Sequence, residues 1–194
     1  MNPVKILVIP GSYRSGSHNV RLAAVITKEL SLQGADATRI SLEDYPLPIY
    51  NGDDEAKNGV PENALKLARL TAAQDGVVFV NPEYNASLTP LMKNTIDWMS
   101  VISKDGGKPL QAYKGRIFAL ASASPGGLGG IRALNHLRAV LLNVGAQMIS
   151  EQVAVGNATT AFDGDDNLKD ERAAQLLVEM CESLLHHARW YARR

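Results

Sequence analysis

The chain has 194 residues, of which 45% are apolar, and its 20 Lys and Arg residues balance its 20 Asp and Glu residues. This length and apolar content suit a single folded domain over 1–194, and a net charge of zero argues against binding nucleic acid or anionic membranes through bulk electrostatics. The single cysteine excludes an internal disulfide framework and a metal site built from several thiolates, as expected in a reducing compartment.

The first element is an apolar run rich in Val and Ile at residues 4–9. Such a run is typical of a strand that is buried on both faces of a parallel sheet. Pro10 and Gly11 end the run after about six apolar residues, too few for the apolar part of a signal peptide or for a membrane span. The sequence therefore predicts an opening strand in a cytoplasmic protein.

Strand-like and helix-like segments alternate along the rest of the chain. Further strands are predicted at 37–42, 76–80, 116–121 and 147–155. Helices are predicted at 19–32, 61–73, 88–102, 131–145 and 168–191. Longer loops are predicted at 43–59, which contains two Asn-Gly turns, and at 156–167. Because each helix must bury its apolar face, this pattern predicts an α/β fold, a doubly wound five-stranded parallel sheet in a three-layer α/β/α sandwich.

Ligands bind beyond the carboxyl ends of the strands in such folds, so the loops after the first, third and fourth strands are the candidate sites. The first loop, 11–19, combines glycines and a helix N-terminus with side-chain donors from Ser12, Arg14, Ser17 and Asn19. These features predict a phosphate-binding loop, with a plain helix-capping turn as the alternative. The loop lacks the Gly-Lys-Ser/Thr ending of a Walker A motif and the spacing of a GxGxxG dinucleotide motif.

The second loop, 81–87, places Glu83, Tyr84 and Asn85 at the end of a buried strand, where they could stack a flat heterocycle and hydrogen-bond its edge. A simple turn is the alternative, because Pro and Asn are common turn formers. The third loop, 122–130, is rich in Ser and Gly, and its small residues leave room for a ligand against the backbone.

Together these loops resemble the NADPH-dependent FMN reductase family, a flavodoxin-like group that includes bacterial chromate and quinone reductases and related azoreductases. The resemblance runs from Val4 to Arg138. It is carried by GSYRSGSHN at 11–19, PEYN at 82–85, KNTIDW at 93–98 and the Ser- and Gly-rich loop at 122–130. The three separated loop motifs occur in the family's order at the matching strand ends.

The resemblance implies FMN as cofactor and NADPH or NADH as co-substrate. The first loop would then bind the FMN phosphate, the second would line the ribityl chain and isoalloxazine, and the third would approach the other edge of the ring. The implied cofactor-binding residues are Ser12, Arg14, Ser17, His18, Asn19, Pro82, Glu83, Tyr84, Asn85, Ser124, Gly126 and Gly127.

The implied activity is transfer of electrons from the nicotinamide through FMN to small-molecule acceptors: quinones, flavins, azo compounds or metal oxyanions such as chromate. No side chain is predicted to be catalytic, because the flavin carries the chemistry. The family also implies a homodimer or homotetramer in which the 43–59 segment reaches the flavin of another subunit.

Two other functions fit parts of the sequence. A flavodoxin-like electron carrier without NAD(P)H turnover would also bind FMN, but such carriers are usually strongly acidic, unlike this chain. A hydrolase could use Ser124 as its nucleophile. However, Ser122 stands where a nucleophile elbow has glycine, and no histidine is clearly placed to assist.

The remaining titratable residues are predicted to be structural. The four His residues show no metal-binding spacing, so no metal is expected. The acidic run at 163–167 begins like a calcium loop but has Leu168 at the glycine position, and it is predicted to be a helix N-cap. Cys181 is predicted to be a packing residue in the last helix.

Overall fold

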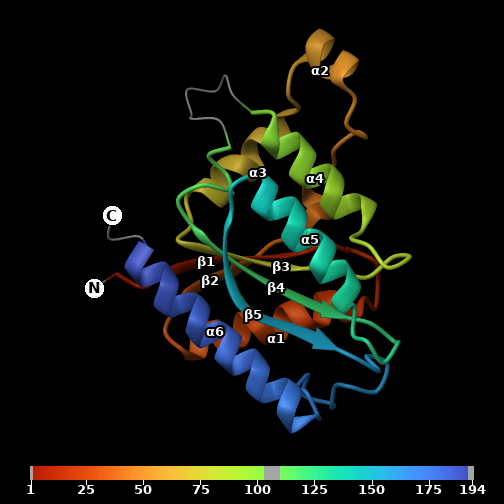
Figure 1. Ribbon diagram of the computed structural model, residues 1–194, viewed down its shortest axis with the longest axis vertical. Helices are drawn as coiled ribbons and strands as arrows, with labels where there is room; N and C mark the ends of the chain where they lie inside the picture. Colours follow the sequence, from red (N-terminus) through yellow and green to blue (C-terminus); the bar gives the residue numbers. More distant parts are fainter. Residues whose placement is uncertain (1, 103–109, 192–194) are drawn as a thin grey trace.

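The structure, a computed structural model, describes residues 2–102 and 110–191 (Figure 1). Five strands form one parallel sheet in the order β2-β1-β3-β4-β5. The strands are β1 (Lys5–Pro10), β2 (Asp36–Arg39), β3 (Gly76–Val80), β4 (Ile117–Ala123) and β5 (Gln147–Val155). The helices are α1 (His18–Leu32), η1 (Leu42–Asp44), α2 (Gly52–Asn58), α3 (Glu62–Ala72), α4 (Pro90–Ser100), α5 (Ile131–Asn143) and α6 (Glu171–Tyr191).

Helices cover both faces of the sheet, as the apolar pattern predicts. In β1, Ile6 and Val8 pack on the face covered by α1 and α6, whereas Leu7 and Ile9 pack on the face of α3, α4 and α5. The central strands β3 and β4 are buried at every position. The predicted flavodoxin-like three-layer sandwich is therefore confirmed.

The observed boundaries correct several predictions at the edges of elements. The strand predicted at 37–42 ends at Arg39, and Leu42 belongs to the short helix η1. The helix predicted at 88–102 begins only at Pro90, after the N-cap residue Thr89, and ends at Ser100. The last helix begins at Glu171 rather than at residue 168.

The predicted loop at 43–59 contains the helix α2, and this is a correction. Asn51 is the N-cap of α2, with its side chain accepting a hydrogen bond from the Asp53 amide, and Gly59 ends the helix with φ of 77°. The two Asn-Gly pairs therefore flank a helix instead of forming two turns. No residue of α2 is buried, so the segment carries no apolar periodicity that would predict a helix.

This α2 segment projects from the body of the molecule (Figure 1). It is attached to α4, where the Trp98 indole donates to the Pro48 carbonyl at 2.7 Å and the Asn94 amide donates to the same carbonyl at 2.8 Å. Ile49, next to this attachment, is 77% exposed. Among the described residues, no helix is long and apolar enough to cross a membrane.

The sheet order places the loops after β1, β3 and β4 at one edge. Chain connections run outward in opposite directions from β1 and β3, because β2 lies beyond β1 while β4 and β5 lie beyond β3. Such a switch point opens a crevice at the carboxyl ends of the strands. The fold therefore brings together the three loops that the sequence singles out.

Candidate functional site

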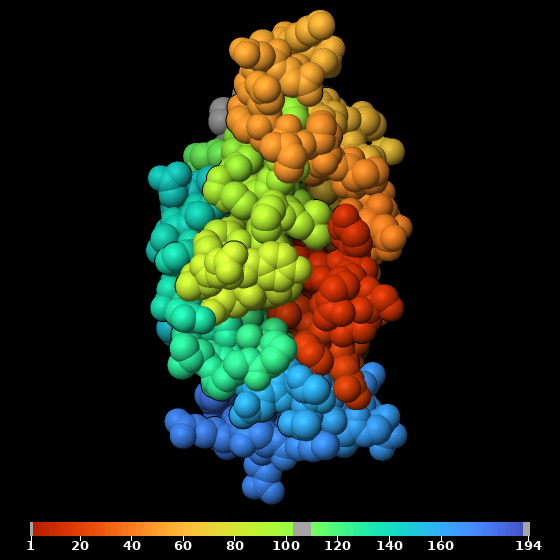
Figure 2. All heavy atoms as spheres, turned by 90° about the vertical axis from the view of Figure 1, so that its right-hand side faces the viewer, coloured from red at the N-terminus to blue at the C-terminus, as the bar shows by residue number. Residues whose placement is uncertain are grey.

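The three loops meet on one face of the molecule. In Figure 2 the loop after β1, in red, lies beside the yellow-green loop after β3 and near the green loop after β4. They enclose a cavity of 140 Å³, lined by Ser12, Arg14, Ser17, His18, Asn19, Pro82, Glu83, Tyr84, Ala123, Ser124 and Pro125. Three of the predicted site residues, Asn85, Gly126 and Gly127, do not line this cavity.

The loop after β1 leaves its polar groups available. Among the described residues, the Arg14 guanidinium donates only to the Ser15 carbonyl at 2.9 Å and the Gly16 carbonyl at 3.4 Å. Ser17 is the N-cap residue of α1, yet its side chain makes no capping hydrogen bond. The alternative of a plain helix cap therefore does not account for this hydroxyl, which points to a role beyond capping.

Asn19 has a structural partner that the sequence does not reveal. Its side-chain amide donates to the Ala123 carbonyl at 2.7 Å, and its oxygen accepts from the Ala123 amide at 2.9 Å. This pair of hydrogen bonds is buried and joins the start of α1 to the end of β4. Asn19 thus fixes two walls of the cavity relative to each other, and one of its amide hydrogens remains for a ligand.

A buried polar network below the cavity joins the first two loops. The Thr89 hydroxyl lies 2.9 Å from the Gly11 carbonyl and 3.2 Å from Asn81 Oδ1, and it accepts from the Met92 amide at 3.2 Å. A Cβ atom on Gly11 would lie 2.7 Å from Asn81 Oδ1, so only glycine fits this approach. Sequence reasoning missed Asn81 and Thr89, although a Thr before a Pro at the first helical position is a recognisable cap signal.

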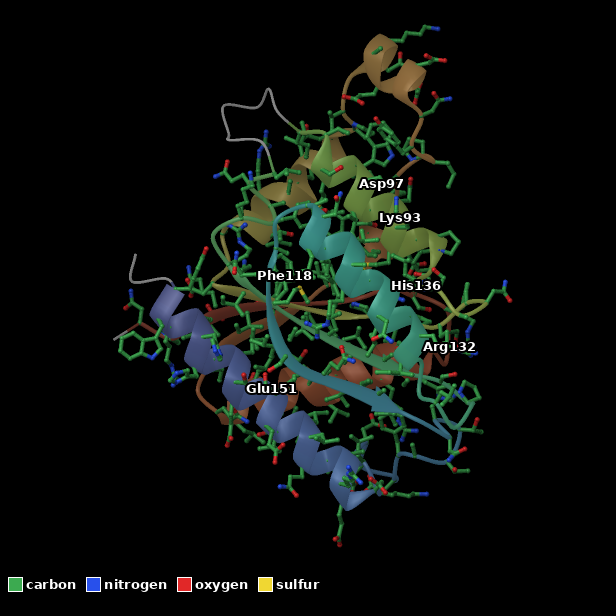
Figure 3. All side chains as sticks on the ribbon, in the orientation of Figure 1. Lys93, Asp97, Phe118, Arg132, His136 and Glu151 are labelled. Carbon is green, nitrogen blue, oxygen red and sulfur yellow. The ribbon has the colours of Figure 1, made fainter. Side chains whose placement is uncertain are left out.

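Glu83 is committed to an ion pair with Arg132 on α5. Its side chain is only 7% exposed, and Arg132 donates to it through Nε at 2.8 Å and through Nη2. These hydrogen bonds, with a further one from the Ala133 amide, hold the pKa of Glu83 below its ordinary value. Figure 3 shows Arg132 on the end of α5 that faces the loops. Arg132 is a residue at this site that sequence reasoning missed.

The residues after Glu83 form a tight turn. Tyr84 and Ser87 exchange backbone hydrogen bonds of 2.9 and 3.0 Å, and the two central residues, Asn85 and Ala86, have φ of 49° and 63°. The His136 ring lies 3.1 Å from the Ser87 hydroxyl and ties the turn to α5. The turn presents Tyr84, which is 52% exposed, at the mouth of the cavity.

The loop after β4 is fixed mainly through its backbone. Ser124 donates its amide to the Val155 carbonyl at 3.0 Å, and the Gly126 carbonyl accepts from Asn157 at 3.3 Å. Gly130 has φ of 89°, and a Cβ atom there would collide with the Ser122 hydroxyl. Ser124 has no histidine partner among the described residues, so the structure does not support a hydrolase triad.

Asp163 and Cys181 have structural roles, and the role of Asp163 corrects the prediction. Asp163 does not cap the last helix: its Oδ1 accepts from the Asp165 and Asn167 amides at 2.9 and 2.8 Å, closing a local turn. Asp170 caps the helix by accepting from the Ala173 amide at 2.7 Å. Cys181 is fully buried in the core, as predicted, and burial raises the pKa of its thiol. Within residues 2–102 and 110–191, no group of three potential metal ligands is found.

The arrangement suits a phosphomonoester attached to a flat ring. The N-terminal end of α1, the Arg14 guanidinium and the Ser17 hydroxyl favour an anion, while the single acidic side chain in the cavity lining is already paired with Arg132. Exposed Tyr84 offers an aromatic face at the other end. These residues fit FMN.

Comparison with known proteins supports this interpretation. The family model described as NADPH-dependent FMN reductase matches residues 4–160. An NAD(P)H-dependent FMN reductase of Pseudomonas aeruginosa is 32% identical over 186 residues, which cover 93% of each chain. A quinone reductase of Escherichia coli is 31% identical over 153 residues, covering 79% of this chain and 77% of the relative.

Solved structures agree with the sequence relatives. The flavoenzyme NAD(P)H:(acceptor) oxidoreductase FerB of Paracoccus denitrificans superposes with a TM-score of 0.79 at 29% identity, covering 97% of this chain and 98% of FerB. The predicted cofactor and activity, FMN and NAD(P)H-dependent oxidoreduction, are thereby confirmed, and the electron-carrier alternative is disfavoured. The chain belongs to the NADPH-dependent FMN reductase family.

Proposed function

We propose that FMN binds where the three loops meet, that the reduced enzyme passes its electrons to quinones, and that two or more copies of the chain assemble around the flavin. The observation that carries this proposal is the shared cavity, whose lining includes all but three of the residues predicted from the sequence. Quinones are proposed as acceptors because one of the relatives is a quinone reductase.

The chain's own residues supply binding and orientation. Arg14 and Ser17 bind the phosphate, with the start of α1 adding its positive dipole end. Asn19 holds this loop against the end of β4, and Glu83 positions Arg132 beside the ring. FMN held by these residues would supply the hydride- and electron-transfer chemistry, so no protein acid or base is required at the reacting atoms.

A second chain is proposed because one chain leaves the site open. The 140 Å³ cavity is smaller than the roughly 300 Å³ or more of an ordinary small-molecule pocket, so a flavin ring would extend beyond it over Tyr84. The projecting α2 segment, with exposed Ile49, is a suitable covering element. Light scattering after size exclusion tests this point, and a monomer at micromolar concentration would contradict it.

The activity is tested with purified protein reconstituted with FMN. We expect two flavin absorption bands, bleaching by NADPH or NADH without oxygen, and return of the bands when a benzoquinone is added. Protein that binds FMN but is not bleached by either nicotinamide would instead be an electron carrier. Protein that does not bind FMN would contradict the proposal. A cytoplasmic location is also proposed, in line with the free buried thiol of Cys181, and cell fractionation tests it.

A further inference from the structure

We propose that the chain also binds FAD, with the adenylate half of this dinucleotide in a second cavity beside the loop after β1. The inference rests on the proposed function, because it takes the flavin phosphate to lie at that loop. The second cavity measures 710 Å³, against 140 Å³ for the first. It is lined by Pro10, Ser12, Tyr13, Arg14, Ser15, Gly16, Ser17, Val20, Arg21, Ala24, Arg39, Ile40, Ser41, Glu43 and Asp166.

The two cavities share the phosphate-binding loop. Ser12, Arg14 and Ser17 line both of them, so both cavities border this loop. FAD is FMN with an adenylate group joined to its phosphate. A ligand whose phosphate is held at this loop would also border the larger cavity, whose 710 Å³ lies within the range of about 300–1,000 Å³ typical of small-molecule pockets.

The charges in the larger cavity suit a second phosphate. Three arginines face two carboxylates there. Arg21 is already committed, since it pairs with Asp166, donates to the Asp163 carbonyl at 2.6 Å and lies 4.8 Å above the ring of Phe162.

Within the described residues, Arg39, at the end of β2, has no ion pair of the kind that Arg21 makes with Asp166. It donates to the Val20 carbonyl at 3.2 Å, and the described part of the chain places no carboxylate within ion-pair distance of it. Its positive charge is free to pair with the added phosphate of FAD.

The rest of the lining matches an adenosine. Tyr13 is 52% exposed and offers a ring face for the adenine, and Ile40 adds an apolar wall. Glu43, just beyond the end of β2, has no ion-pair partner among the described residues. Carboxylates accept hydrogen bonds from ribose hydroxyls in dinucleotide-binding folds, and the Glu43 carboxylate, in η1 at the cavity lining, offers the same chemistry.

The same adenylate chemistry occurs in NAD(P)H, which is not joined to the flavin phosphate. The shared loop favours FAD, because a group joined to a phosphate held at this loop would lie beside the second cavity. An experiment that measures flavin binding and nicotinamide use separately distinguishes the two sources.

The test titrates flavin-free protein with FMN and with FAD and follows flavin fluorescence. It compares the natural protein with Arg39→Ala and with Arg189→Ala, a matched control that removes an exposed arginine from the far end of α6. We expect both flavins to bind the natural protein. Arg39→Ala should raise the dissociation constant of FAD about tenfold, because one charge-assisted hydrogen bond is lost. The dissociation constant of FMN should change less than about twofold.

A second variant keeps the inference testable if Arg39→Ala is unstable. Glu43→Gln retains the shape of the side chain, and it should weaken the binding of FAD but not that of FMN. Thermal melting followed by circular dichroism checks that either variant is folded. If the natural protein binds FMN and excludes FAD, or if Arg39→Ala weakens both flavins equally, the inference is overturned and the proposed function stands. If Arg39→Ala leaves FAD binding unchanged and raises the KM for NADPH, the cavity belongs to the nicotinamide nucleotide. If neither flavin binds, the proposed function fails as well.

Discussion

The loops after β1 and β3 border the same cavity, yet they use their polar side chains in opposite ways. In the first loop, the Arg14 guanidinium meets only backbone carbonyls and the Ser17 hydroxyl makes no cap. In the second loop, Asn81 donates to the Pro82 carbonyl, and Glu83 pairs with Arg132. Hence Arg14 and Ser17 of the first loop are available to a ligand, whereas Asn81 and Glu83 of the second loop hold the cavity together.

This contrast separates ligand binding from stability. Changes at Arg14 or Ser17 in the first loop should weaken FMN binding while the protein stays folded. Changes in the second loop, or in the side chains that support it, should lower the free energy of unfolding first and flavin affinity as a consequence. Substitutions at Thr89, Arg14, Glu83 and Ala86, each with a control or companion variant, test this distinction.

The largest effect is expected at Thr89. Thr89→Val preserves the shape but removes the cap on the Met92 amide and the hydrogen bond to the buried Gly11 carbonyl. We expect the free energy of unfolding to fall by about 3 kcal/mol, because a cap is lost and buried polar groups are left unpaired. Urea unfolding measures this loss.

Thr89→Ser is the matched control, since it retains the hydroxyl and loses only a methyl group. It should recover most of the stability. If Thr89→Val were as stable as the natural protein, the network of Asn81, Thr89 and Gly11 would not be what holds the first two loops together.

The next largest effect is expected at Arg14, and it is an effect on binding. Arg14→Ala should raise the dissociation constant of FMN by about ten- to a hundredfold, because a charged, multi-donor contact to the phosphate is lost. The melting temperature of the flavin-free protein should change little, since Arg14 is exposed and bonds only to its own loop. Fluorescence titration and thermal melting provide the two measurements.

Arg14→Lys sharpens this result because it keeps the charge and removes the planar fork. An intermediate affinity would indicate that geometry as well as charge matters. Unchanged FMN affinity in Arg14→Ala would count strongly against a phosphate at this loop.

Local sequence patterns were sufficient to predict the sheet and to single out the three loops that border the candidate site. Apolar runs such as 76–80 are buried at every residue, and a strand with this property is recognisable without knowing its neighbours. The polar loops at the strand ends follow from the same pattern. Once β1, β3 and β4 lie side by side, their loops must meet at one edge.

The division of roles within the loops depends on distant partners and was not predictable. Asn19 bonds to Ala123, which lies 104 positions along the chain, and Glu83 pairs with Arg132, 49 positions away. Nothing near either residue in the sequence indicates these pairs. The helix α2 was missed for a different reason: it has clear end signals at Asn51 and Gly59, but an exposed helix shows no apolar face.

A smaller, pH-dependent effect is expected at Glu83. Because Arg132 lowers its folded-state pKa below the ordinary 4.5, the ionised carboxylate stabilises the fold above about pH 4.5. That stabilisation is lost as the pH falls through the lowered pKa. Glu83→Gln should therefore be less stable than the natural protein at pH 7, by about 1 kcal/mol or less because Arg132 is half exposed.

The difference between the two proteins should narrow as the pH approaches 3, and urea unfolding at several pH values measures it. A difference that stays constant from pH 7 to pH 3 would indicate that the Glu83 charge does not stabilise this wall of the cavity. Arg132→Gln, which removes the other partner, should show the same narrowing.

The smallest effect, and the only expected gain, is at Ala86 in the turn after Glu83. Ala86 has φ of 63°, a left-handed conformation that costs a residue with a Cβ atom about 1 kcal/mol and costs glycine little. Ala86→Gly would create an Asn-Gly pair, the preferred sequence for a turn with two positive φ angles, and should stabilise the protein by about 0.5 kcal/mol after the added flexibility of the unfolded chain is counted. Ala86→Val should destabilise it, because a β-branched side chain is strained there.

Because Ala86→Gly leaves every side-chain contact of the loop in place, FMN affinity should stay the same in this variant. A clear change in affinity would mean that the backbone of the second loop, and not only its anchoring side chains, meets the ligand.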